Sequence, residues 1–136
     1  MYKQDDPYLN PLGKWGCYFT SLYNLAENET GNIRSKQSVF LLFANALKAG
    51  WVDGEATVLA PDQIMQSMGS RYRFKAKTDS LYQCKPDEAE ILKFVKPGHT
   101  HFVLGDGAGK IAYDPLTDHD MSPYKLLEKR IYKRMP

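Results

Sequence analysis

The hydrophobic pattern of this chain changes period near residue 70, and that change limits the folds that the chain can adopt. Before this point, apolar residues recur at the three- and four-residue spacing of amphipathic helices. After it, they alternate with polar residues, as in half-buried strands. The sequence therefore predicts helices first and an antiparallel sheet second. Such segregated elements favour the α+β class, with N-terminal helices packed on a C-terminal sheet, over an alternating parallel-sheet fold.

Three helices are expected in the first half of the chain. The first spans residues 17–28, and Gly31 lies where a helix stop is needed. Ser35 is a suitable N-cap for a second helix that extends to Lys48 and is closed by Gly50. The third helix is short and spans residues 61–68, with a proline in its first turn, where the missing N–H costs no hydrogen bond.

The second half predicts strands. Residues 72–76 alternate between apolar and basic side chains, whereas residues 89–96 fit either a strand or a helix, and we favour a strand. Residues 101–114 read as a hairpin whose turn is the glycine-rich segment 105–109. The tail over residues 124–133 is compatible with a final strand or a helix.

Length and composition fit a single globular domain over residues 1–136, with 43% hydrophobic and 25% charged residues. A net charge of +2 gives no ground for a nucleic-acid partner. Basic residues gather at 71–77 and 125–134; we interpret the first group as the solvated face of a strand, with an acidic partner as the alternative. The polar start has no signal-peptide core, and no segment approaches the roughly 20 apolar residues that cross a bilayer, so we expect a cytoplasmic chain with reduced thiols and no membrane association.

Cys17 is the candidate nucleophile. A free cysteine has a pKa near 8.5, and the N-terminus of a helix stabilises its thiolate form. Cys17 begins the first predicted helix directly after Gly16, whose missing side chain would let the backbone turn sharply and leave the sulfur open to a substrate. Cys84 lacks such a setting, and we interpret it as a structural residue.

A thiol nucleophile also needs an imidazole, and the imidazole needs a group that orients it. His101 opens the predicted hairpin and Asp114 ends it, so a turn centred near Gly107 brings both to the same open end. Gln4 supplies an amide that is suited to donate a hydrogen bond to the oxyanion of an attacked carbonyl.

Four segments carry a resemblance to the papain clan of cysteine peptidases, in the bacterial branch that looks like the bacteriocin-leader-processing peptidases. They are QDDP at 4–7, GCYFTS at 16–21, HFVLGDG at 101–107 and IAYDP at 111–115, in the order of that branch and over nearly the whole chain. The resemblance implies a papain-like fold, a bacterial or phage source, a peptide or protein substrate, and no cofactor or metal.

The same resemblance implies a role for each residue that matches its motifs. Cys17 would be the nucleophile, His101 the base, Asp114 the group that orients His101, and Gln4 the oxyanion donor. The residues flanking the cysteine are expected to bind substrate: Trp15, Gly16 and Tyr18. Relatives often have glycine and then proline after the cysteine, where this chain has Tyr18 and Phe19, whose bulk would narrow the cleft.

Other functions stay open beside the peptidase. One is a catalytically inactive papain-fold protein that binds a protein or nucleic acid through its basic strand and tail. Another is an NlpC-type cell-wall amidase or endopeptidase, which shares the Cys–His order but normally orients its histidine with a second histidine or another polar group.

Other roles for single residues stay open as well. His99 is an alternative base, although the pattern puts it in the turn before the strand, and His119 falls in a polar loop. A zinc site built from Cys17, His99 and His101 lacks the short ligand spacing of such sites. Asp114 precedes a proline and also fits a plain turn residue.

Overall fold

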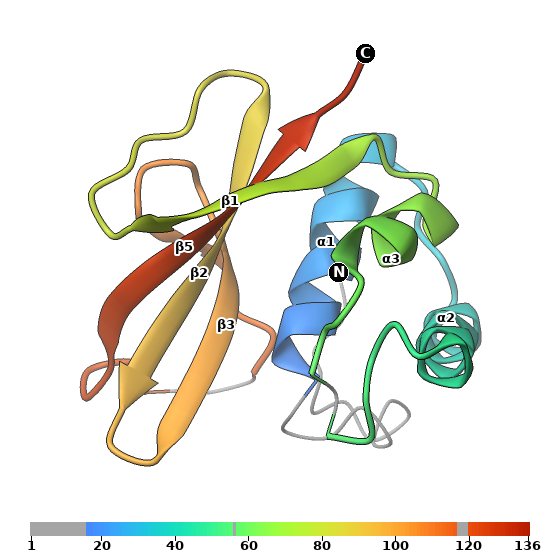
Figure 1. Cartoon of the computed structure of the whole chain (residues 1–136), viewed down its shortest axis with the longest axis horizontal. Coiled ribbons are helices and arrows are strands. Elements are labelled where there is room, and N and C mark those ends of the chain that lie inside the picture. The colour runs from blue at the N-terminus through green and yellow to red at the C-terminus, as the bar shows by residue number, and fades with distance from the viewer. Residues whose placement is uncertain (1–15, 56, 117–119) are drawn as a thin grey trace.

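The computed structural model describes residues 16–55, 57–116 and 120–136, in which three helices precede five strands. The helices are α1 (Cys17–Thr30), α2 (Lys36–Ala49) and α3 (Pro61–Ser67). The strands are β1 (Tyr72–Asp79), β2 (Glu88–Lys96), β3 (His99–Gly105), β4 (Ile111–Tyr113) and β5 (Lys125–Arg134). The predicted α+β class is therefore confirmed, and the helices lie beside the sheet, not between its strands (Figure 1).

The ends of α2 follow directly from the local sequence. The Ser35 side chain accepts a hydrogen bond from the backbone N–H of Ser38, which satisfies one of the free donors of the first turn. At the other end, Gly50 adopts a left-handed conformation with φ of 79°, and its N–H donates to the carbonyl of Leu47. Both predicted caps of this helix are confirmed.

The five strands form one antiparallel sheet in the order β1-β5-β2-β3-β4. The C-terminal tail is thus a strand, and it lies between β1 and β2 rather than at an edge. The ambiguous segment at 89–96 is also a strand, β2, which pairs with both β3 and β5. This register places Phe102, Lys93 and Glu128 side by side across three strands.

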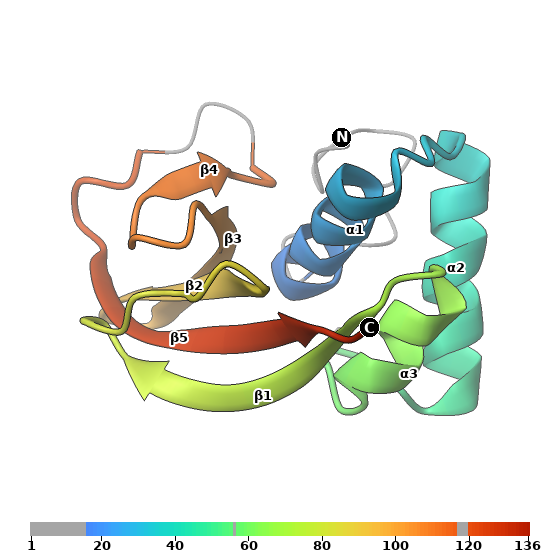
Figure 2. The ribbon, with the colours of Figure 1, turned by 90° about the horizontal axis from the view of Figure 1, so that it is seen from above.

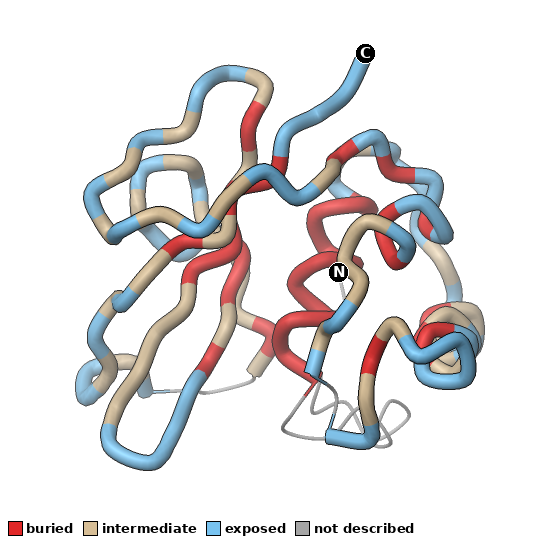
Figure 3. Tube along the Cα trace, viewed as in Figure 1, coloured by how far each residue is buried: buried red, intermediate tan, exposed pale blue. Residues whose placement is uncertain are grey.

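Helix α1 is the centre of the core. It is buried continuously from Cys17 to Glu27 (Figure 3), and it lies between the sheet and α2 (Figure 2). Phe19 packs edge-on against Phe43 of α2, with 5.2 Å between ring centroids, and Leu22 is fully buried. Burying a large apolar side chain of this kind contributes about 1.5–3 kcal/mol, so packing on both sides fixes the position of the helix and of its first residue.

The helices of the described residues are short. Within residues 16–55, 57–116 and 120–136, no helix combines the length and the apolar character needed to cross a bilayer.

Candidate active site

Cys17 is the first residue of α1, as its sequence setting predicts. Gly16 is the N-cap, and no side chain among the described residues caps the helix there. The first turn holds no acidic residue, so the positive end of the helix dipole acts on the Cys17 sulfur without a competing carboxylate on the same turn. The sulfur therefore lies at the positive end of the α1 dipole.

His101 contacts Cys17 from the neighbouring strand. It is the third residue of β3, it is buried, and its side chain makes a hydrogen bond with Cys17. Its Nε2 atom lies 2.7 Å from Oδ1 of Asp114, which leaves Nδ1 as the ring nitrogen on the Cys17 side. The Tyr124 ring lies close as well, with 6.3 Å between the two ring centroids. Both nitrogens of the imidazole thus have a hydrogen-bond partner, and the Tyr124 ring lies beside it.

Asp114 directly follows β4, at the open end of the predicted hairpin. Its Oδ1 atom accepts hydrogen bonds from His101 and, at 2.9 Å, from the backbone N–H of Leu116. One oxygen of Asp114 therefore contacts both the imidazole ring and the backbone of the following turn.

These contacts decide the charge of the imidazole. Burial lowers the pKa of His101, because it removes water from the charged form. The hydrogen bond to Asp114 and the hydrogen bond and charge of Cys17 act in the other direction and prevail, raising the pKa of His101 from 6.5 to about 9. At neutral pH, the ring is consequently an imidazolium that lies between the Cys17 sulfur and the Asp114 carboxylate.

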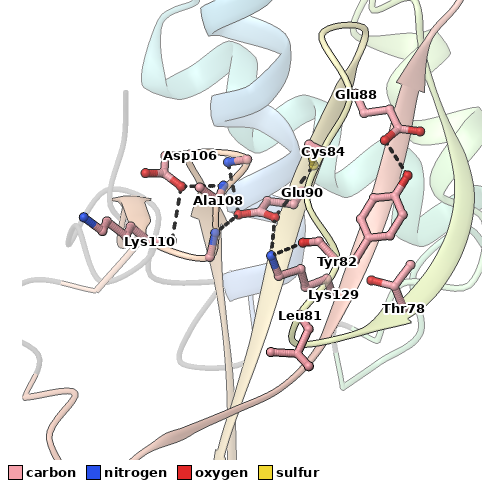
Figure 4. Close-up of polar contacts among 12 residues, drawn as sticks. Thr78, Leu81, Tyr82, Cys84, Glu88, Glu90, Asp106, Ala108, Lys110 and Lys129 are labelled. Atoms are coloured by element: carbon pink, nitrogen blue, oxygen red, sulfur yellow. Dashed lines mark hydrogen bonds and ion pairs between the residues drawn. The ribbon is translucent and has the colours of Figure 1, made fainter.

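A buried carboxylate, Glu90, holds the turn between β3 and β4 that carries Asp114 to this position (Figure 4). Its Oε2 atom accepts hydrogen bonds from the backbone N–H groups of Gly107 and Gly109, at 3.0 and 2.9 Å. Its Oε1 atom lies 3.0 Å from Nζ of Lys129, and both side chains are fully buried. A buried charge pair bonded in this way rigidifies its surroundings, so the glycine turn is a fixed support for the site.

A cavity of about 400 Å³ opens beside the nucleophile. Its lining includes Cys17, Tyr18, Lys93, His99, Phe102 and Arg130. Tyr18 is fixed in this wall, because its hydroxyl lies 2.6 Å from that of Tyr132 and its ring lies 4.6 Å from the ring of Phe102. The volume lies within the range of pockets that bind small molecules or single side chains.

Sequence reasoning missed Lys93 and Arg130 as residues of this cavity. Each occupies a strand whose charged residues resemble a solvated face when read alone. Only the register reveals their position, since β2 and β5 lie side by side and Lys93 pairs with both Phe102 and Glu128. Knowledge of the strand order is the signal that would have found them.

Three expectations about the site are wrong. The backbone of Gly16 has φ of −82° and ψ of 11°, which any residue can adopt, so no sharp glycine turn is needed there. The Cys17 side chain is also not openly exposed, since the residue is 5% accessible, although it contributes to the lining of the cavity. His99 is the first residue of β3 and not part of the turn, because it pairs with Lys96 across the two-residue turn Pro97–Gly98.

Several predicted residues fall elsewhere. Gln4, Trp15 and His119 lie outside the described residues. Cys84 is a free thiol, as is Cys17, and burial together with the carboxylates of Glu90 and Glu88 raises the pKa of Cys84 to about 12. The raised pKa makes Cys84, which the sequence indicated as a structural residue, a poor nucleophile at neutral pH.

Within the ranges that the structure describes, no three or more His, Cys, Asp or Glu side chains form a group that could hold a metal ion. The hypothetical zinc site of Cys17, His99 and His101 is thus not assembled in this part of the chain.

Comparison with known proteins gives a family and no function. No curated protein and no solved structure matches the chain. A family described as "Protein of unknown function, DUF261" matches residues 1–134. Because the match covers nearly all of the 136 residues, the chain belongs to the DUF261 family.

Proposed function

We propose that this protein is a thiol-dependent peptidase or amide hydrolase, with Cys17 as nucleophile, His101 as acid and base, and Asp114 as the group that orients the ring. The observation that carries the proposal is the hydrogen-bonded series from Cys17 through His101 to Asp114. Its three members come from the start of α1, from β3 and from the residue after β4. A buried series of nucleophile, imidazole and carboxylate is the arrangement that activates thiols and hydroxyls for acyl transfer.

The charge state of the series favours attack by the sulfur. With a pKa of about 9, His101 is protonated at pH 7, and an imidazolium beside a cysteine stabilises the thiolate. The thiolate attacks a carbonyl carbon, the S–C bond forms, and the carbonyl electron pair moves onto oxygen. When the C–N bond breaks, His101 gives its proton to the leaving amine, and a thioester remains on Cys17.

Hydrolysis then restores the starting state. The neutral imidazole takes a proton from water, whose oxygen attacks the thioester carbonyl. The C–S bond breaks, the acid product leaves, and the thiolate and imidazolium are regenerated. Asp114, whose Oδ1 lies 2.7 Å from Nε2, orients the ring and stabilises the imidazolium in each half of the cycle.

The oxyanion formed in both steps must be stabilised by hydrogen-bond donors. Backbone N–H groups at the start of α1 point out of the helix without intrahelical acceptors, and that of Cys17 is adjacent to the reacting sulfur. The Gln4 amide is the second donor in this proposal, by the resemblance of QDDP to the lead-in of the papain branch. The same resemblance supports a papain-like fold, and the segregation of helices from an antiparallel sheet is compatible with it.

The test is the rate at which iodoacetamide alkylates Cys17 at about pH 6, followed by mass spectrometry of the intact chain. A free thiol has little thiolate at that pH, so we expect Cys17 to react at least about tenfold faster than glutathione. His101→Gln should remove the advantage, and Asp114→Asn should reduce it. Cys84 serves as an unreactive reference in the same molecule, because its pKa is about 12.

His99→Gln is the matched control. It changes the other histidine near the cavity, two residues from His101 on the same strand, and its side chain is exposed. Labelling that survives His99→Gln and is lost in His101→Gln assigns the base to His101. If wild-type Cys17 reacts no faster than glutathione, the proposed enzyme has no activated thiol and the proposal is wrong.

A second candidate is a papain-fold protein that binds its ligand without catalysis. One observation favours it: Cys17 is 5% accessible and His101 only 2%, so the reacting atoms are nearly covered. Slow labelling of Cys17 in a well-folded chain would support this candidate. An NlpC-type cell-wall hydrolase would in turn be distinguished by release of soluble fragments from purified peptidoglycan.

A further inference from the structure

Two cationic side chains line the cavity beside Cys17. Lys93 projects from β2 and Arg130 from β5, and both contribute to the same wall as the nucleophile. Their side chains are 22% and 14% accessible, so each charge is held close to the protein surface with little water around it. Positive charges in so restricted a space act strongly on any ligand that enters.

The two cations share one carboxylate. Oε1 of Glu128 lies 3.4 Å from Nζ of Lys93, and Oε2 lies 3.4 Å from Nε of Arg130. Strong charge-assisted hydrogen bonds are about 2.7–2.9 Å long, so neither contact is at full strength. One negative charge therefore balances two positive charges, and an excess of about one positive charge remains at the wall.

The aromatic rings hold Arg130 in place. Its guanidinium carbon lies 5.7 Å from the ring centroid of Tyr18 and 5.4 Å from that of Phe102. Tyr18 is in turn bonded to Tyr132, so the guanidinium faces the cavity from a rigid aromatic base. The opposing charge on the lining is Glu55, which is exposed and screened by water.

Resting on the proposed function, we infer that this cavity selects peptides that carry an acidic side chain close to the bond that Cys17 attacks. A substrate carboxylate would meet Lys93 and Arg130 from the cavity side and complete their charge balance. Because hydrogen bonds to charged groups are stronger than neutral ones, an acidic residue should be preferred over its amide by at least about tenfold. Lys93 and Arg130 are then specificity-determining residues, separate from the acid–base machinery.

The test is protection of Cys17 from iodoacetamide by capped peptides at constant ionic strength. One peptide, acetyl-Ala-Ala-Glu-Ala-Ala-amide, carries the carboxylate, and a second has Gln in place of Glu. We expect the acidic peptide to give half-protection at about one tenth of the concentration that the neutral peptide needs.

Three variants test the direction in which the preference for the acidic peptide changes. Lys93→Gln should abolish the preference for the acidic peptide, whereas Glu128→Gln should strengthen it by releasing both cations from their shared carboxylate. Lys48→Gln is the matched control, since it removes one exposed lysine from the end of α2, outside the cavity lining, and should change nothing.

The outcomes separate this inference from the function on which it rests. Fast labelling of Cys17 with equal protection by both peptides would overturn the acidic specificity and leave the thiol enzyme intact. Slow labelling of Cys17 in the absence of peptide would overturn both. If inorganic phosphate protects as well as the acidic peptide, the wall is a general anion site and the assignment to acidic peptides is wrong.

Discussion

Nε2 of His101 lies 2.7 Å from Oδ1 of Asp114, although 13 positions separate them along the chain. The β3–β4 hairpin brings the two together, and no long-range rearrangement of the chain is needed for this contact. The pair raises the pKa of a buried imidazole and thereby couples the charge of the site to the stability of the fold.

The first prediction follows from that coupling and concerns stability against pH. The pKa of His101 is raised from 6.5 to about 9 by folding, so its contribution is fully present below pH 6.5 and is lost as pH rises through about 9. At about 1.4 kcal/mol per pKa unit, the free energy of unfolding should fall by on the order of 3 kcal/mol across that window. Urea titrations followed by circular dichroism at several pH values measure it.

Two variants check the origin of this fall. His101→Gln should flatten the profile, and Asp114→Asn should move the fall to lower pH, because it removes the largest interaction that raises the pKa of His101. A profile that His101→Gln leaves unchanged would assign the pH dependence to other groups.

The second prediction concerns Cys84. Burial, with Glu90 and Glu88 nearby, raises the pKa of its thiol to about 12. At about pH 8, the thiolate fraction should be roughly a thousandfold below that of a free cysteine, and alkylation slows by a similar factor. Mass spectrometry after iodoacetamide treatment of a Cys17→Ser variant isolates Cys84. The same reaction in guanidinium chloride is the reference, and it should proceed at the rate of an ordinary thiol.

The third prediction concerns the buried ion pair of Glu90 and Lys129. Both side chains are fully buried, and their charged atoms are 3.0 Å apart. Removing one partner leaves the other charge buried and unpaired, so Glu90→Gln or Lys129→Met should destabilise the fold by about 3–5 kcal/mol. The midpoints of urea denaturation measure this loss.

The double variant carrying both changes provides the control. It should lose less than the sum of the single losses, because no uncompensated charge remains. It should still be less stable than the wild type, since the N–H groups of Gly107 and Gly109 lose a charged acceptor. Additive losses would mean that the two charges do not interact.

The fourth prediction concerns Gly105. A Cβ atom at this position would lie 2.5 Å from Oε2 and 2.6 Å from Cγ of Glu90, and bonds to Lys129 and two backbone N–H groups prevent that side chain from moving away. Gly105→Ala should therefore cost about 1–3 kcal/mol of stability. Gly54→Ala is the matched control, because an added Cβ there meets no atom within 4 Å and the thermal midpoint should not change.

Local patterns in the sequence were enough to predict the parts of the fold that depend on neighbours in the chain. Ser35 and Gly50 bound α2 as expected, and the glycine turn brings His101 and Asp114 together. The contact between Cys17 and His101 is not local. It was expected because a thiol nucleophile at a helix start needs an imidazole, and His101 lies on a strand that can supply one.

The remaining features depend on which strands lie side by side, and no local sequence pattern indicates that order. Lys129 belongs to a basic tail that resembles a solvated surface, yet it is fully buried against Glu90 from another strand. Lys93 and Arg130 likewise reach the cavity only because β5 lies beside β2. Burying a charged side chain costs much less free energy when an oppositely charged partner is buried beside it, and the partner here is distant in sequence.

The position of β5 between β1 and β2 has a consequence for the order of events during synthesis. A chain leaving the ribosome presents Cys17, His101 and Asp114 before it presents Arg130 and Tyr132, and β1 has no neighbouring strand until β5 arrives. Nearly all of the cavity lining precedes Asp114 in the chain, and Arg130 is the lining residue that enters with β5. One segment thus completes both the Arg130 side of the cavity and the pairing of β1.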